Sequence, residues 1–231
     1  MTPIREEIVH VNGHPKKMIM FLHGYIDDAD TIDARLQYMI DNLDDVVIRV
    51  PLSPYCCEVH EGKKQWYSMH RFDPNDDRKF VKTMNECAAC YDKMGLGLME
   101  AYSYLKPYME NCLNEYELEE KDLFICGFSQ GATLAIYSSL LAEDRVAGCV
   151  SFGGMIAPHS YLLKNYLNTP DFLLIHGDQD NLVRYDALEF TKKHLKGMGS
   201  KVETLTIKDE NHRISDEGVR AMVKFIKKRM G

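Results

Sequence analysis

Apolar residues along the chain occur either in short continuous runs or at intervals of three and four. The first pattern is typical of strands buried on both faces of a sheet, and the second of helices that cover such a sheet. Strands are predicted at residues 8–11, 18–22, 46–50, 123–126, 146–152, 172–175 and 202–207. Helices are predicted at residues 31–43, 94–112, 132–141, 160–167, 185–198 and after Ser215. This alternation predicts an α/β protein with a doubly wound, mostly parallel sheet and helices on both faces.

Two features depart from this alternation. Pro107 lies inside the helix predicted at 94–112, and it should kink or interrupt that helix because proline lacks an amide hydrogen. Segment 51–85 has no convincing periodicity and is expected to form a lid or substrate loop. Within this segment, Trp66 and Tyr67 are predicted to bind the substrate, with simple anchoring of the loop by packing as an equally favoured alternative.

Length and composition favour a single domain spanning residues 1–231, because 231 residues that are 45% hydrophobic can bury one sizeable core. The formal net charge of −7 argues against nucleic acid as a partner. The N-terminal sequence lacks the apolar core of a signal peptide, and no apolar run approaches the ~20 residues of a transmembrane segment. We therefore expect a cytoplasmic protein with no transmembrane segment. Its oligomeric state is left open, and a homodimer is one of the alternatives.

Cysteine occurs seven times, and this odd number fits free thiols in a reducing compartment better than a disulfide framework. Cys87 and Cys90 have the spacing of half a zinc or redox site. Because no second pair and no spaced histidines accompany them, two buried thiols one helical turn apart are expected instead. The sequence therefore predicts no structural disulfide, no metal and no cofactor.

The strongest chemical signal is Gly127-Phe128-Ser129-Gln130-Gly131, placed between a predicted strand and a predicted helix. Two glycines let the strand and the helix approach closely, so that the serine between them is held in a strained turn with its hydroxyl exposed. This order of strand, turn and helix is typical of a nucleophile elbow. A serine that merely caps the helix is the bland alternative.

Ser129, Asp180 and His212 each follow a predicted strand, in the order Ser, Asp, His. The carboxyl ends of parallel strands share one edge of a sheet, so the three side chains should meet there. A serine hydroxyl is a weak nucleophile, and an imidazole that titrates near neutrality can remove its proton during attack. Asp180 would then orient the imidazole of His212. The alternatives are Asp178 and Asp186 for the acid, and His176 and His194 for the base.

A carbonyl group attacked by such a serine needs two donors for its developing oxyanion. One is expected to be the backbone N–H of Gln130, directly after the nucleophile, and the other that of Tyr25 in the loop after the second strand. His23 is expected to shape this loop. The acidic residues that follow are expected to form a solvated loop, with an entrance for cationic substrates as the alternative; they are Asp27, Asp28 and Asp30.

These motifs together resemble the phospholipase/carboxylesterase family of α/β-hydrolases, which includes the acyl-protein thioesterases. The resemblance rests on motifs that stand in the family's order over nearly the whole chain, namely FLHG, Trp66-Tyr67, GFSQG, HGDQD followed by Leu182-Val183, and Asn211-His212 followed by Ile214 and Glu217. It implies an α/β-hydrolase fold, a Ser129, Asp180, His212 triad, and an oxyanion hole at Tyr25 and Gln130. It also implies hydrolysis of an ester or thioester through an acyl-enzyme, without a cofactor.

The chain departs from the family pattern at three places. Gly131-Ala132 replaces the usual Gly-Gly, and Asn211 replaces the usual glycine before the histidine; both changes suit a turn. The stretch 68–79 is strongly charged, whereas a lid that holds long acyl chains should be more apolar. We therefore expect a small-molecule ester or thioester of short to moderate acyl length as substrate. A long-chain acyl-protein thioesterase or lysophospholipase and a non-catalytic binding protein are the alternatives.

Overall fold

A central sheet of seven strands organises the computed structural model, which describes Ile4 and residues 7–27 and 29–230. The strand order is β1-β3-β2-β6-β7-β8-β9, and only the β1–β3 pair is antiparallel. The strands are β1 (Glu7–Asn12), β2 (Lys17–Leu22), β3 (Val46–Pro51), β6 (Leu123–Phe128), β7 (Gly148–Phe152), β8 (Phe172–Gly177) and β9 (Val202–Ile207). All seven predicted strands are therefore present, in a mostly parallel sheet.

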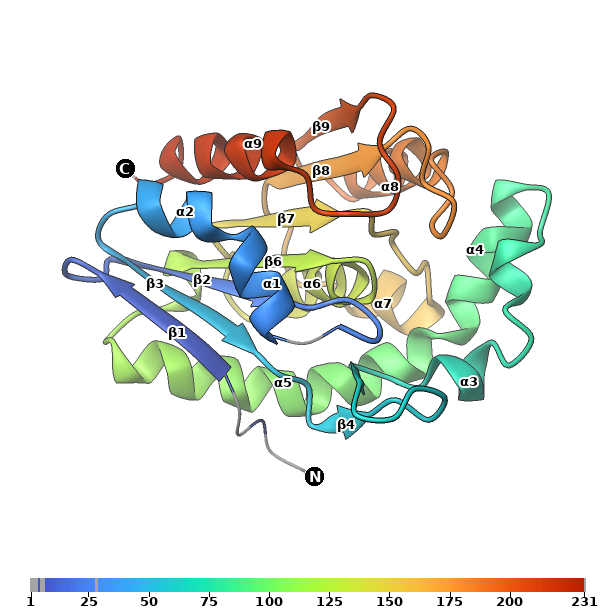
Figure 1. Cartoon of the computed structure of the whole chain (residues 1–231), viewed down its shortest axis with the longest axis horizontal. Helices are drawn as coiled ribbons and strands as arrows, with labels where there is room; N and C mark the ends of the chain where they lie inside the picture. Colours follow the sequence, from blue (N-terminus) through green and yellow to red (C-terminus); the bar gives the residue numbers. More distant parts are fainter. Residues whose placement is uncertain (1–3, 5–6, 28, 231) are drawn as a thin grey trace.

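Helices cover both faces of the sheet, and each face has its own hydrophobic core (Figure 1). On one face lie α1 (Ala29–Arg35), α2 (Gln37–Asn42) and α9 (Asp216–Lys227). On the other lie α4 (Met84–Lys93), α5 (Gly95–Glu115), α6 (Gln130–Leu141), α7 (Ser160–Asn165) and α8 (Ala187–Gly197). This is the doubly wound arrangement that the alternation of strands and helices predicts.

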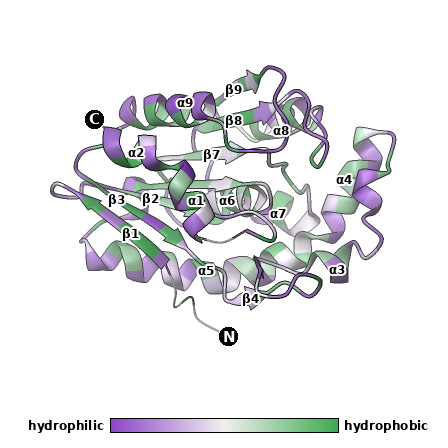
Figure 2. Cartoon of the chain, viewed as in Figure 1, coloured by the Kyte–Doolittle hydropathy of each residue, from purple (hydrophilic) through white to green (hydrophobic). Residues whose placement is uncertain are grey.

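The degree of burial follows the hydrophobic pattern of each element. Hydrophobic and hydrophilic residues alternate along the ribbon of α9, which covers the sheet with one stripe and turns the other to solvent (Figure 2). Every residue of α6 is buried, since this helix packs between the sheet and α5. Edge strand β1 alternates exposed and half-buried residues, whereas the inner strands are almost wholly buried.

Two predicted helices differ from the structure. The helix expected at 31–43 is divided into α1 and α2 at Leu36, which is fully buried and has non-helical backbone angles. The helix expected at 94–112 is longer, because α5 runs without interruption through Pro107. An interruption at Pro107 is therefore not found, and the buried residues Leu105 and Met109 on either side of it hold the helix against the core.

Segment 51–85 is more structured than its sequence suggests. It contains the short β4–β5 ribbon, the one-turn helix α3, a 3₁₀ turn and the start of α4; their bounds are Tyr55–Cys56, Lys64–Gln65, Met69–Phe72, Asp77–Lys79 and Met84. Figure 1 shows α3 and α4 beyond the carboxyl ends of the parallel strands. Asp73 is buried and pairs with Arg78, so charged side chains help to fold this segment.

A buried charge ties the edge strand to the sheet. Arg49 of β3 is only 4% exposed, and its guanidinium donates to Glu7 of β1 at 2.8 Å and to Glu115 at the end of α5 at 2.5 Å. Tyr116 lies beneath the guanidinium, 5.5 Å from its carbon to the ring centroid. Removing Arg49 leaves the partly buried carboxylate of Glu7 without its cation, whereas Glu115 is 58% exposed and stays hydrated.

We predict that Arg49→Met lowers the free energy of unfolding by about 2–4 kcal/mol, because Glu7 and Glu115 lose their shared partner. Arg145→Met is the matched control. Arg145 is 58% exposed and its partner Asp171 also binds Arg229, so the loss should be below about 1 kcal/mol. Urea unfolding of the two variants measures the difference, and equal losses would show that the Arg49 cluster adds no particular stability.

Candidate active site

Ser129 stands in a strained turn between β6 and α6. Its backbone has φ of 53° and ψ of −115°, a conformation that costs a non-glycine residue free energy. Its amide donates to the carbonyl of Phe152 at 2.8 Å, which ties the turn to β7. Its side chain makes no capping hydrogen bond with α6, so it does not serve as a helix cap. The serine lines a pocket instead.

The two glycines of the turn are required by close packing. A Cβ on Gly131 would lie 2.2 Å from the carbonyl oxygen of Leu22, and one on Gly127 would lie 2.4 Å from that of Gly131. Any side chain at these positions would push α6 away from β2 and β6. The close approach of helix and sheet thus sets the position of Ser129.

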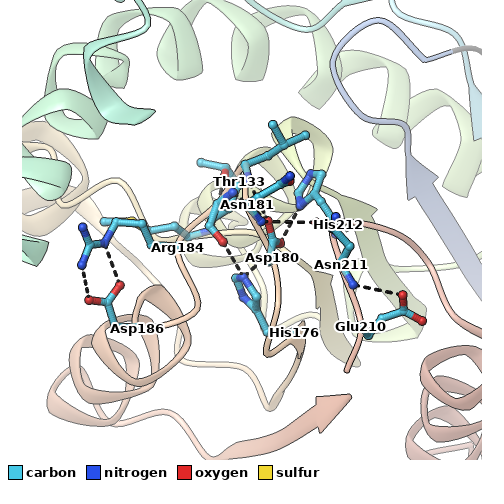
Figure 3. A network of polar contacts seen from close by, with 12 residues as sticks. Thr133, His176, Asp180, Asn181, Arg184, Asp186, Glu210, Asn211 and His212 are labelled. Carbon is cyan, nitrogen blue, oxygen red and sulfur yellow. Dashed lines mark hydrogen bonds and ion pairs between the residues drawn. The ribbon is translucent and has the colours of Figure 1, made fainter. Parts of the chain in front are cut away.

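Asp180 and His212 are brought together by the loops that follow β8 and β9 (Figure 3). Oδ2 of Asp180 accepts a hydrogen bond from Nδ1 of His212 at 2.6 Å, and both side chains are largely buried. Oδ1 accepts from the amides of Leu182 and Val183 at 2.9 and 2.8 Å. Because Nδ1 donates to the carboxylate, Nε2 of His212 is left as the basic nitrogen.

A second imidazole reaches the same carboxylate. Nε2 of His176 lies 2.9 Å from the carbonyl of Val183 and 3.2 Å from Oδ2 of Asp180. A carbonyl oxygen can only accept, so Nε2 of His176 carries a proton that both oxygens share. Burial raises the pKa of Asp180, but hydrogen bonds from His176 and His212 outweigh it and hold the pKa well below the usual range.

Sequence reasoning named His176 only as an alternative base, and it assigned no part in the site to the side chain of Asn211. Oδ1 of Asn211 accepts from the amide of His212 at 2.8 Å and from that of Asn181 at 3.3 Å (Figure 3). Asn211 therefore joins the loop that carries Asp180 to the loop that carries His212. The available sequence signal for His176 was its place at the end of a strand, just before the acid. No sequence signal pointed to the side chain of Asn211.

The other candidate residues have different partners. Asp178 accepts from the amide of Asp209 at 2.8 Å, and Asp186 pairs with Arg184 at 2.7 Å. His194 lies within α8 and contacts the carbonyl of Phe190. Among these acidic and imidazole candidates, His212 is the one that lines the pocket of Ser129, and Asp180 is the carboxylate hydrogen-bonded to it.

The pocket beside Ser129 has a volume of about 470 Å³ and includes His212 and Tyr25 in its lining. The ring of Phe128 contacts that of His212, with 4.7 Å between centroids. No hydrogen bond joins Ser129 to His212 in the described part of the chain. Catalytic hydrogen bonds often tighten only when substrate binds, so a missing bond does not argue against the two residues acting together. Both residues line the same pocket.

The loop before α1 lies on one side of the pocket, and its positions are held by segment 51–85. The amide of Ile26 donates to the carbonyl of Lys64 at 2.9 Å, and the thiol of Cys57 donates to the hydroxyl of Tyr25 at 3.2 Å. His23 is fully buried and accepts from the amide of Ser53 at 3.1 Å, which agrees with a shaping role. Asp28 lies outside the described residues.

Gln130 connects the nucleophile turn to Trp66 and Tyr67. Its side-chain oxygen accepts from the amide of Trp66 at 2.8 Å, and its nitrogen donates to the carbonyl of Tyr67 at 2.9 Å. Its own amide stands at the first position of α6, where no carbonyl of the helix can accept from it. The side chain of Gln130 thus points into the protein and leaves its amide beside Ser129.

Trp66 and Tyr67 are 1% and 4% exposed, and neither lines the pocket. The indole of Trp66 donates to the carbonyl of His23 at 2.8 Å and stacks with Tyr104. These contacts are those of the packing alternative. They hold the loop of Tyr25 and the turn of Ser129 in fixed relation.

Among the described residues, no group of three or more His, Cys, Asp or Glu side chains could hold a metal ion. The seven cysteines are free, and only Cys56 among them is exposed. Burial raises the pKa of Cys87 to about 11, so this thiol is a poor nucleophile and a poor metal ligand at neutral pH. In the same part of the chain, no helix is both long and apolar enough to cross a bilayer.

The fold and the arrangement of these residues define an α/β-hydrolase. A family model described as phospholipase/carboxylesterase matches residues 4–230, and the chain belongs to this family. It is 31% identical over 131 residues to acyl-protein thioesterase 1 homolog 1 of Dictyostelium discoideum, covering 56% of this chain and 58% of that protein. Acyl-protein thioesterase 1 of Candida albicans is 22% identical, with 95% of each chain covered.

Solved structures support the same fold. The crystal structure of esterase PE8 superimposes with a TM-score of 0.83 at 22% identity, covering 96% of this chain and 97% of that one. The crystal structure of SOBER1 from Arabidopsis thaliana gives a TM-score of 0.73 at 19% identity, covering 93% of this chain and 99% of the other. At these identities the structural likeness establishes the fold alone.

We predict that His176→Leu raises the pKa of Asp180 toward its ordinary value of about 3.9, because the carboxylate loses one donor. His176→Gln is the matched control, since its amide nitrogen can still donate. A ¹³C NMR titration of labelled aspartate measures both variants. An unchanged pKa in the leucine variant would mean that the 3.2 Å contact contributes nothing to the charge state of Asp180.

The sign of the accompanying stability change follows from proton binding. Below the ordinary aspartate pKa, the unfolded chain binds a proton that folded Asp180 does not, so stability falls as the pH drops through this window. The stability contributed by Asp180 is present above that pKa. In His176→Leu this acid-dependent loss should be smaller, as unfolding curves between about pH 5 and pH 3 would measure.

Proposed function

We propose that this chain is a serine hydrolase that cleaves carboxylic esters or thioesters through an acyl-enzyme on Ser129. The observation that carries the proposal is the 2.6 Å contact between Asp180 and His212 beside a pocket that also contains the strained Ser129. A buried carboxylate, an oriented imidazole and a serine at a nucleophile elbow are the parts that acyl transfer requires. The family's name and its relatives' names support the same reaction class.

In acylation, Oγ of Ser129 bonds to the carbonyl carbon, and its proton passes to Nε2 of His212. The carbonyl electrons move to the oxygen, which accepts hydrogen bonds from the amides of Tyr25 and Gln130. The negative charge of Asp180 stabilises the imidazolium without taking the proton. When the tetrahedral adduct collapses, the bond to the leaving oxygen or sulfur breaks and His212 gives that atom the proton.

In deacylation, a water molecule takes the place of the leaving group. Nε2 of His212 removes a proton from the water, whose oxygen bonds to the acyl carbon. Collapse of the second adduct breaks the bond to Oγ of Ser129, and His212 returns the proton to this oxygen. The products are a carboxylic acid and an alcohol or thiol, and neither redox chemistry nor a co-substrate other than water is involved.

We infer a small substrate with a short to moderate acyl group. The pocket volume of about 470 Å³ is within the range of small-molecule sites, and its lining mixes apolar residues such as Met69 and Leu182 with charged ones such as Asp76 and Lys79. A long acyl chain would have to pass these charged groups. Segment 51–85 supplies much of this lining, so we assign it the role of substrate loop. Trp66 and Tyr67 anchor this loop by packing in the protein interior.

The free thiols indicate the cellular compartment in which the protein acts. Six of the seven free cysteines are buried, and none is paired in the structure. We propose a reducing compartment, the cytoplasm, as the location. A homodimer is retained as an expectation that light scattering on the purified chain would test.

We predict that the wild type hydrolyses p-nitrophenyl esters, with the highest kcat/KM for short to moderate acyl chains. Ser129→Ala should lower kcat by about 10⁴-fold or more, because the attacking oxygen is lost. The matched control is Ser138→Ala, which removes a buried hydroxyl of the same helix that has no partner among the described residues. Its activity should remain close to that of the wild type.

Two outcomes would decide against parts of this proposal. An optimum at long acyl chains would replace the short-chain preference with that of a lipid-directed thioesterase. Full activity in Ser129→Ala, or no activity of the wild type on any ester of the series, would overturn the serine mechanism and favour a binding role.

A further inference from the structure

A second, smaller hollow also has His212 in its lining. Its volume is about 200 Å³, and it shares Asp27, Phe128 and His212 with the larger pocket. Ser129 lines only the larger one. The two cavities therefore adjoin at these three residues, one of which is the proposed base His212.

The two cavities differ in charge. The charged groups of the larger pocket, apart from histidines, are three carboxylates and one ammonium: Asp27, Asp73, Asp76 and Lys79. Those of the smaller hollow are one carboxylate and two guanidinium groups: Asp27, Arg35 and Arg213. Arg78 pairs with Asp73 and Asp76, and Glu210 pairs with Arg213, so the contrast rests on Arg35, which no described carboxylate neutralises. An anion is therefore better accommodated in the smaller hollow than in the larger pocket.

The two arginines are available for a ligand. Arg35 ends α1 and makes no hydrogen bond or ion pair with any described residue. Arg213 directly follows His212, and its Nε pairs with Glu210 at 2.5 Å. Both side chains are exposed, so their remaining N–H groups can turn toward the hollow. A guanidinium presents paired donors that match the oxygens of a carboxylate or phosphate.

The proposed reaction indicates which part of the substrate reaches the smaller hollow. The acyl carbon bonds to Ser129 and therefore remains at the larger pocket. The leaving oxygen or sulfur must come within reach of His212 to receive its proton, so the group attached to it extends past His212. Phe128 and Ile214 offer apolar surface there, and Arg35 and Arg213 lie at the same hollow.

We propose that this hollow is the leaving-group subsite, and that Arg35 and Arg213 select esters or thioesters whose alcohol or thiol part carries an anionic group. The inference rests on the proposed function and adds the chemical class of the leaving group. The arginines hold the remote carboxylate or phosphate while His212 protonates the leaving atom. They neither form nor break a bond, so the atoms and electrons of the hydrolysis are unchanged.

The test compares two esters that share an acetyl group and differ only in leaving-group charge. These are 4-acetoxybenzoate, which is anionic, and methyl 4-acetoxybenzoate, which is neutral. We expect Arg35→Gln and Arg213→Gln each to lower kcat/KM for the anionic ester by about fivefold, mainly through KM. Both variants should leave kcat/KM for the neutral ester within about twofold of the wild type.

Arg145→Gln is the matched control, because this exposed arginine precedes β7 and lies at the opposite end of the parallel strands from the site. It should leave the ratio of the two kcat/KM values unchanged. An unchanged ratio in Arg35→Gln and Arg213→Gln, while the neutral ester is still hydrolysed, would overturn the inference alone. Absence of turnover of the neutral ester by the wild type would overturn the proposed function, and the inference with it.

A second pair of substrates separates the two anions. Replacing the carboxylate with a phosphate monoester gives 4-acetoxyphenyl phosphate, whose neutral partner is phenyl acetate. A larger fall in kcat/KM for the phosphate ester in Arg35→Gln assigns the subsite to phosphorylated alcohols, and a larger fall for the benzoate assigns it to carboxylates. Equal kcat/KM values for variant and wild type with both anions would overturn the proposal.

Discussion

The carboxylate of Asp180 is the group on which the arrangement of the site depends. An ionised carboxylate that is 1% exposed would be very costly without partners, and here it has four donors: the amides of Leu182 and Val183 and the imidazoles of His176 and His212. Three of these donors come from β8 and its following loop, and the fourth comes from the loop after β9. Satisfying one buried charge therefore fixes the path of both loops.

Both backbone polar groups of Val183 hold the loop after β8 in place. Its amide donates to Asp180 while its carbonyl accepts from His176, so the loop closes on itself through the carboxylate and the imidazole. Asn211 then joins it to the second loop through two backbone amides. His212 is thus held at the pocket of Ser129 by a network of hydrogen bonds, and such preorganisation is what the proposed general base needs.

Ser129, the proposed nucleophile, is positioned by packing rather than by charge. α6 lies so close to β2 that only glycine fits at 131, and Gln130 uses its side chain to fix Trp66 and Tyr67. Segment 51–85 is therefore anchored to the turn of Ser129 near its middle, while its charged residues fold the part that surrounds the pocket. One segment therefore both fixes the turn of Ser129 and lines the pocket beside it.

The sequence alone determined the strands, because runs such as Met18–Leu22 can be buried only inside a sheet, and it determined the candidates Ser129, Asp180 and His212, because strand ends share one edge. It did not determine the course of α5 through Pro107 or the break at Leu36, since packing against the core overrides local preference. Only the tertiary structure decided three other features. These are the burial of Trp66, the approach of His176 to Asp180, and the presence of Arg35 and Arg213 at one hollow. Each of the three depends on contacts between residues distant along the chain or on the direction of a side chain. A local sequence pattern predicts neither such contacts nor side-chain directions.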